Sequence, residues 1–105
     1  MTDKRVVLTT CASLEEARHI AQALVERRLA ACVNILPQVE SVYRWKGEVE
    51  TAPEWLLMIK TTEGVFDRLR EAIAELHSYE VPECIEIAIT EGSAAYLNWI
   101  EEAVR

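Results

Sequence analysis

A short polar segment at residues 77–83, H-S-Y-E-V-P-E, contains the side chains best suited to metal chemistry. Imidazole nitrogens and carboxylate oxygens together suit borderline ions such as copper and zinc. His77 and Glu83 are therefore candidate metal ligands, on a turn that Pro82 stiffens. One His with acidic neighbours is an open site that other elements or a neighbouring subunit must complete. The alternative is a solvated or interface loop in which His77 stabilises the dipole of a preceding helix.

A second set of candidates combines aromatic and charged side chains. Its members are Tyr43, Arg44, Trp45 and Lys60 on two expected strands, and Tyr79 and Glu80 in the segment 77–83. On paired long strands such groups could line a cleft between subunits that binds a small ligand. The alternative is that they are interface anchors, since oligomer contacts favour aromatic residues and Arg. No residue demands catalysis, so we expect a protein that is not an enzyme.

Hydrophobic periodicity predicts the elements that position these residues. In chain order they are strand 5–10, helix 13–29, strand 31–45, strand 48–61, helix 62–77, strand 85–90 and a final helix that opens at 92–93. Ser13 and Glu16 form a capping-box pattern at the start of the first helix, and Thr62 is a candidate cap for the second. This β-α-β-β-α-β order is the ferredoxin-like, split β-α-β arrangement of the α+β class, with both crossover helices on one sheet face.

The strand at 31–45 is too long for a compact subunit. Fifteen extended residues span about 50 Å, whereas a compact domain of this length has a diameter of only about 33 Å. The hairpin should therefore overhang, with Val42, Tyr43, Trp45 and Trp55 on an exposed edge that needs a partner. This predicts a homo-oligomer. The alternative is a hairpin that breaks at Pro37 and folds back on its own domain.

Composition narrows the class of protein. A chain of 105 residues predicts one domain, 1–105, and its net charge of −7 argues against nucleic acid or an anionic membrane as partner. No apolar run approaches the length of a membrane span. The first residues also lack a signal-peptide pattern, and together these observations predict a cytoplasmic location. Three cysteines without a C-x-x-C pair predict free thiols.

Five segments together resemble the CutA family of divalent-cation tolerance proteins. They are A-A-C-V-N at 30–34, Y-R-W-K-G-E-V-E at 43–50, L-M-I-K-T-T at 57–62, H-S-Y-E-V-P-E at 77–83 and Y-L-N-W-I at 96–100. They follow the family's order over nearly the whole chain, and the first two blocks together are quite specific. The resemblance implies a ferredoxin-like subunit, a homotrimer built through long strands, a cytosolic location in bacteria, and a link to copper and other divalent cations.

The sequence departs from the family at the copper ligands. Some members are described with copper held by a cysteine at the end of the first strand and by paired histidines before the Tyr-Pro turn. Here Thr9 stands at the cysteine position and Leu76 at the first histidine position, and only His77 matches. Cys11 lies two residues past the cysteine position. Because strand ends and the loop after the second helix can lie together in this fold, Cys11 joins His77 and Glu83 as a candidate ligand.

The leading hypothesis is a trimer that binds or senses divalent metal without being an enzyme. A small-ligand signalling module is the alternative, because the fold and trimer resemble the nitrogen-regulatory PII proteins, although the turn at 45–48 is too tight for their long effector loop. An acylphosphatase-type enzyme needs a phosphate cradle and an Arg after the first strand, and residues 9–13 offer neither. An RNA-binding domain would need a basic surface, which the net charge of −7 opposes.

Overall fold

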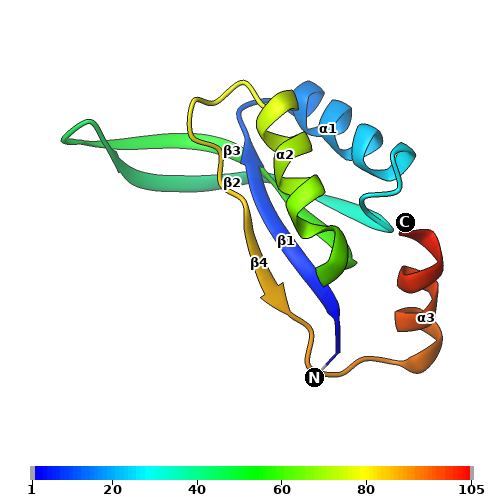
Figure 1. The fold of residues 1–105 in the computed structure, drawn as a ribbon. Helices are drawn as coiled ribbons and strands as arrows, with labels where there is room; N and C mark the ends of the chain where they lie inside the picture. The colour runs from blue at the N-terminus through cyan, green and yellow to red at the C-terminus, as the bar shows by residue number, and fades with distance from the viewer. Residues whose placement is uncertain (1, 105) are drawn as a thin grey trace.

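The computed structural model describes residues 2–104 and confirms the predicted fold. Its elements are β1 (Lys4–Cys11), α1 (Leu14–Glu26), β2 (Cys32–Trp45), β3 (Glu48–Thr62), the 3-10 turn η1 (Glu63–Val65), α2 (Phe66–Leu76), β4 (Ile85–Ala88) and α3 (Ala94–Ala103). The four strands form one antiparallel sheet in the order β2-β3-β1-β4. Helices α1 and α2 pack on one face of this sheet, and α3 lies beside the end of the sheet at which β1 begins (Figure 1).

Helix α1 begins as the sequence predicts, whereas α2 does not. Ser13 caps α1, because its hydroxyl accepts a hydrogen bond from the Glu16 N–H at 3.1 Å. In place of the second bond of the predicted capping box, the Glu16 carboxylate accepts a hydrogen bond from the Ser78 N–H. Thr62 makes no capping bond, because it still pairs with Lys4 in the sheet and η1 intervenes before α2 begins at Phe66.

The hydrophobic core lies between the sheet and the two helices. Strand alternation points Val7, Leu57 and Ile59 toward the helices, and all three are fully buried. The helices complete the core with Ala17, Ile20, Ala21 and Leu24 from α1 and Leu69, Ala72 and Ile73 from α2. Val25 is half-exposed, since it lies about 80° around α1 from Ala17, at the edge of the apolar stripe.

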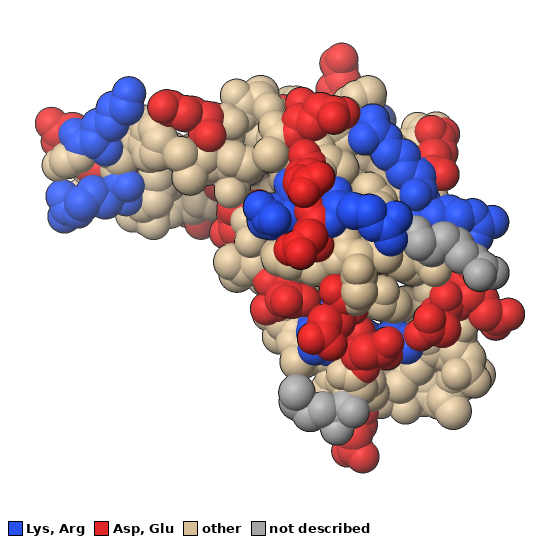
Figure 2. Space-filling view, in the orientation of Figure 1, with Lys and Arg blue, Asp and Glu red and all other residues tan. Residues whose placement is uncertain are grey.

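The second face of the sheet carries apolar side chains that no helix covers. The alternate positions of the paired strands place Val6, Leu8, Leu36, Leu56, Met58, Ile85 and Ile87 on this open face. Ile85 and Ile87 are 51% and 48% exposed. On the face of the molecule shown in Figure 2, acidic and basic side chains both occur. Among residues 2–104, no helix is long and apolar enough to cross a membrane.

The long hairpin overhangs the rest of the subunit, as predicted from its length. β1 ends with Cys11 opposite Trp55, so β3 from Glu48 to Glu54 pairs with β2 alone. This arm extends the molecule to 44 Å along its longest axis, against 25 and 23 Å across (Figure 1). Lys46 and Gly47 both have positive φ, which suits the tight turn at the tip. The fold-back alternative is therefore wrong. Trp55, which was expected on the exposed edge, instead lies opposite Cys11 at the base of the arm and packs against the core.

A β-bulge at Pro37 and Gln38 separates the two halves of β2. The pairing passes from Leu36–Leu56 to Val39–Glu54, so β2 advances three residues while β3 advances two. Gln38 takes a φ of 55°, which accommodates the extra residue. Beyond the bulge, Ser41 and Tyr43 project to the same side of the hairpin as Glu54.

We expect Leu57→Ala to lower the free energy of unfolding by about 2–5 kcal/mol, because it opens a cavity at the centre of the core. Urea denaturation at fixed protein concentration measures this change. The control is Glu71→Ala, which removes an exposed side chain of α2 and should stay within about 0.5 kcal/mol of the parent protein. A Leu57→Ala loss no larger than that of the control would contradict the core described above.

Candidate metal cluster and adjoining cleft

The site forms where the 77–84 segment, which joins α2 to β4, passes the end of β1. His77 is the C-cap residue of α2, and its backbone N–H donates to the Ile73 carbonyl at 2.9 Å. The segment then runs beside the base of the overhanging hairpin (Figure 1). Two features meet here, a buried cluster on the helix side and an open cleft on the hairpin side.

The buried cluster consists of Cys11, Glu16 and His77. One ligand atom from each residue, a thiol sulfur, a carboxylate oxygen and an imidazole nitrogen, lies within 4.8 Å of the other two. The Cys11 Sγ is 3.9 Å from His77 Nε2, and Glu16 Oε2 is 4.0 Å from His77 Nδ1. Cys11 is fully buried and His77 is 8% exposed. These donor types are compatible with a borderline cation such as copper or zinc.

Hydrogen bonds fix the tautomer of His77. The Tyr79 backbone N–H donates to Nδ1 at 3.1 Å, so Nδ1 carries the lone pair. Nε2 therefore carries the hydrogen and donates to the Thr10 carbonyl at 2.7 Å. Both ring nitrogens are occupied, so a cation that binds His77 must displace one of these two partners.

The surroundings of Cys11 and Glu16 shift the pKa values of both side chains. Burial, reinforced by the negative charges of Glu16 and Glu54, raises the pKa of the Cys11 thiol to about 12. Burial opposes ionisation of Glu16, but hydrogen bonds from Ser78 outweigh it and lower the pKa of that carboxyl. At neutral pH the cluster thus holds a thiol and a carboxylate, and a metal would have to displace the thiol proton.

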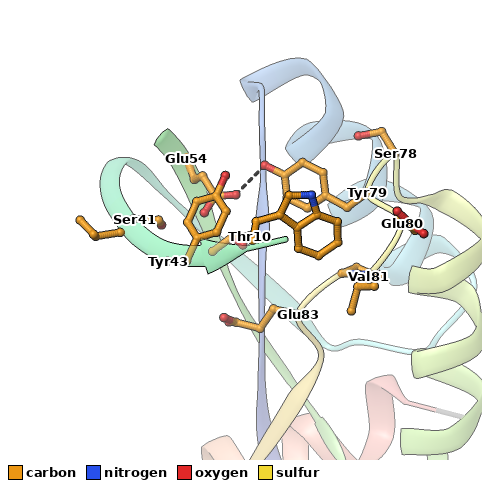
Figure 3. Close-up of a pocket in the computed structure, with 12 residues that line it drawn as sticks. Thr10, Ser41, Tyr43, Glu54, Ser78, Tyr79, Glu80, Val81 and Glu83 are labelled. Carbon is orange, nitrogen blue, oxygen red and sulfur yellow. Dashed lines mark hydrogen bonds between the residues drawn. The ribbon is translucent and has the colours of Figure 1, made fainter. Parts of the chain in front are cut away.

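The open cleft has a volume of about 760 Å³ and lies between the hairpin and the 77–84 segment (Figure 3). The hairpin contributes Ser41, Val42, Tyr43, Trp45 and Glu54, the end of β1 contributes Thr10, and the segment contributes Ser78, Tyr79, Glu80, Val81, Pro82 and Glu83. The Tyr79 hydroxyl donates to Glu54 Oε2 at 2.5 Å and joins the two walls. This volume is in the range of small-molecule sites.

The cleft is strongly acidic for its size. Glu54 is only 6% exposed, although it is ionisable and lines a cavity. Desolvation raises the pKa of Glu83, and the Glu54 charge adds to this rise. Desolvation and the bond to Glu54 likewise raise the pKa of the Tyr79 hydroxyl, which stays a donor. The lining residues include three Glu and no Lys, Arg or His.

The structure brings some of the sequence-predicted site residues together and separates others. Cys11 and His77 are adjacent in the buried cluster, whereas Glu83 lies in the cleft with Tyr43, Trp45, Tyr79 and Glu80.

Two predicted residues lie apart from the cleft within this chain. Arg44 donates to the Gly47 carbonyl at the hairpin tip, and Lys60 donates to Asn34 Oδ1 in the paired part of the sheet.

Sequence reasoning missed Glu16 and Glu54 as members of these sites. Glu16 was assigned to helix capping, and only tertiary structure shows that its carboxylate turns to Ser78. Glu54 had a usable signal, because it is the sole charged residue between Thr51 and Ile59. A carboxylate inside such an apolar strand needs a partner or a function.

Comparisons with known proteins agree with this fold. The family model "CutA1 divalent ion tolerance protein" matches residues 5–103. A divalent-cation tolerance protein CutA from Thermus thermophilus is 52% identical over 94% of this chain and 96% of its own length. The mouse Protein CutA is 44% identical over 89% of this chain, which spans about half of the mouse protein. A solved structure of the Thermus thermophilus divalent cation tolerance protein superposes with a TM-score of 0.95 at 51% identity, covering 97% of this chain and 99% of that one.

The architecture of the sheet defines the class of protein, and the sequence matches define the family. The split β-α-β sheet with an overhanging hairpin is the architecture of the divalent-cation tolerance proteins. The chain belongs to the CutA1 family, as its sequence motifs predicted.

The lowered pKa of Glu16 predicts a pH dependence of stability in the metal-free protein. Its folded pKa lies below the ordinary value of 4.5, so the carboxylate stabilises the fold fully above that value. This contribution is lost as the pH falls through the folded pKa. Glu16→Gln should therefore be less stable than the parent protein at pH 6, and the difference in unfolding free energy should shrink as the pH falls below 4.5 through the folded pKa.

Urea denaturation across this pH range measures the Glu16 effect. Glu15→Gln is the matched control, since Glu15 is an exposed residue in the same helical turn. A Glu16→Gln difference that stays constant with pH, or that equals the Glu15→Gln difference, would contradict the assigned role.

Proposed function

We propose that this protein contributes to divalent-cation tolerance by binding a borderline cation, copper in particular, and that it does so without catalysing a reaction. The observation that carries the proposal is the convergence of Cys11, Glu16 and His77, whose ligand atoms lie within 4.8 Å of one another. The relatives named as divalent-cation tolerance proteins support the same proposal. Glu16 supplies the carboxylate in this cluster, and Glu83 lies outside it.

The donor set fits copper or zinc once the Cys11 thiol loses its proton and His77 gives up one of its two hydrogen bonds. The thiolate of Cys11 and one nitrogen of His77 supply soft and borderline donors. Thr9, which stands at the cysteine position of some family members, points to the same side of β1 as Cys11 and is fully buried. Among the described residues, its hydroxyl is a buried oxygen without a hydrogen-bond partner. In this proposal Cys11 supplies the sulfur ligand from the same side of the strand, two residues beyond Thr9.

We also propose that the protein works as a cytoplasmic homotrimer. The open apolar sheet face, with half-exposed Ile85 and Ile87, supports association with further copies of the chain. The overhanging hairpin supplies a second surface that a neighbouring copy would cover. The number three follows from the family resemblance, and the free thiols suit a reducing compartment.

A small-ligand signalling module is the second candidate function. The observation that favours it is the cleft of about 760 Å³, because a cluster of three metal ligands needs no such cavity. In a trimer this cleft would lie near a subunit boundary, since its hairpin wall is part of the overhang.

Calorimetric titration with Cu²⁺ and Zn²⁺ tests the metal proposal. We expect binding tighter than about millimolar in the parent protein and at least about tenfold weaker binding in His77→Ala, which loses a ligand. Cys84→Ser is the matched control, because Cys84 is a half-buried thiol outside the cluster. If neither ion binds below about millimolar, or if His77→Ala binds like the parent protein, the metal site is wrongly assigned.

Size-exclusion chromatography with light scattering tests the oligomer. The parent protein at micromolar concentration should have three times the mass of one chain. Ile87→Lys should shift the mass toward a single chain, because it places a charge on the open face. Val25→Lys, at a similarly exposed apolar position on α1, should remain trimeric. A parent protein with the mass of one chain would refute the trimer, and circular dichroism checks that each variant is folded.

A further inference from the structure

We propose that the cleft between the hairpin and the 77–84 segment binds an organic cation, an alkylammonium or guanidinium group, with Glu54 as its main counter-charge. This proposal gives the small-ligand candidate its chemical class, and it involves different residues from the metal cluster. It depends on three observations: a buried acidic group without a cationic partner, aromatic side chains beside it, and a cavity large enough for an organic body.

Glu54 is a buried carboxylate that the chain does not neutralise. Its hydrogen bond comes from the uncharged Tyr79 hydroxyl, and no Lys, Arg or His nitrogen among residues 2–104 forms an ion pair with it. Buried charges are normally paired or bound to a cation, because desolvating an isolated one costs several kcal/mol. The bond to Tyr79 occupies Oε2, which leaves Oε1 to meet a ligand in the cleft.

A second acid strengthens the preference for a cation. Glu83 lines the same cleft, where burial first and then the proximity of the Glu54 charge raise its pKa and favour its neutral form. A cation placed between the two carboxyl groups would relieve their repulsion and could bond to both. The same charges, together with Glu80, oppose a phosphate or carboxylate ligand. This argues against nucleotides, the other obvious choice for a small signalling ligand.

The aromatic side chains distinguish an organic cation from a bare metal ion. Tyr43 and Tyr79 line the cleft beside Glu54 (Figure 3). Trp45 is a further aromatic residue of the lining. Ring faces attract ammonium and guanidinium groups and also cover the apolar part of an organic molecule. Lys46 already shows this attraction, since its Nζ lies 5.7 Å from the centroid of the Trp45 ring. A metal ion would use neither the rings nor a volume of about 760 Å³.

Calorimetry with a charged ligand and its neutral isostere tests the proposal on the assembled protein. The probes are n-butylguanidinium, n-butylammonium and n-butylurea, which matches the guanidinium in shape without its charge. We expect at least one cation to bind and the urea to bind about tenfold more weakly or not at all. Glu54→Gln keeps the acceptor for Tyr79 but removes the charge, and should weaken cation binding by about tenfold or more.

Glu50→Gln is the matched control, because Glu50 is an exposed carboxylate on the same strand outside the cleft. It should bind the cation like the parent protein. Tyr43→Leu, which removes one ring and no charge, should weaken binding by a smaller factor. Thermal melting of each variant establishes that it is folded, and Glu83→Gln replaces Glu54→Gln if the latter is not.

Each other outcome has a definite meaning. Equal binding of n-butylurea and n-butylguanidinium, or unchanged binding in Glu54→Gln, would overturn the proposal. So would displacement of the cation by Mg²⁺ with equal loss of Mg²⁺ binding in Glu54→Gln, which would make the cleft a metal site. If ATP stabilises the protein while no organic cation binds, the small-ligand function stands and the cation class is wrong. If nothing binds, both fail.

Discussion

The geometry of the site depends on a difference in length between two paired strands. β3 has fifteen residues, whereas its partner β1 has eight. β1 stops at Cys11, so Glu54 and the residues before it have a hydrogen-bonded neighbour on one side only. The 77–84 segment passes through the space where β1 would have continued. The cleft, the exposed hairpin edge and the position of the buried cluster all follow from that early stop.

The two features at the end of β1 are joined through backbone atoms of neighbouring residues. His77 bonds to the Thr10 carbonyl and to the Tyr79 N–H, and Thr10 and Tyr79 both line the cleft. The rings of His77 and Tyr79 also lie 4.7 Å apart. A cation that rotated or displaced the His77 ring would therefore move a cleft residue.

Sequence patterns predicted the fold well, because its signals are local. The stripe of α1, the alternation of the strands and the Lys46-Gly47 turn each depend on neighbours in the chain. The site was predicted only in part. Cys11 and His77 are 66 residues apart, and their approach was anticipated from topology alone. The partners of Glu16 and Glu54 were not anticipated. Nothing local distinguishes a capping Glu from one that reaches Ser78, and the apolar neighbours of Glu54 indicate that it needs a partner without identifying Tyr79.

The extra residue in β2 determines which side chains the hairpin offers to the cleft. Strand side chains alternate, so a phase shift of one position exchanges the two faces of everything beyond it. Without the bulge at Pro37 and Gln38, Val42 and Arg44 would face Glu54 in place of Ser41 and Tyr43. Val42 would then take the place of Tyr43 opposite Glu50, and Arg44 that of Trp45 opposite Glu48, so the cleft would lose two aromatic rings. The number of residues in β2 thus determines, as much as their identity does, which side chains a cation would meet in the cleft.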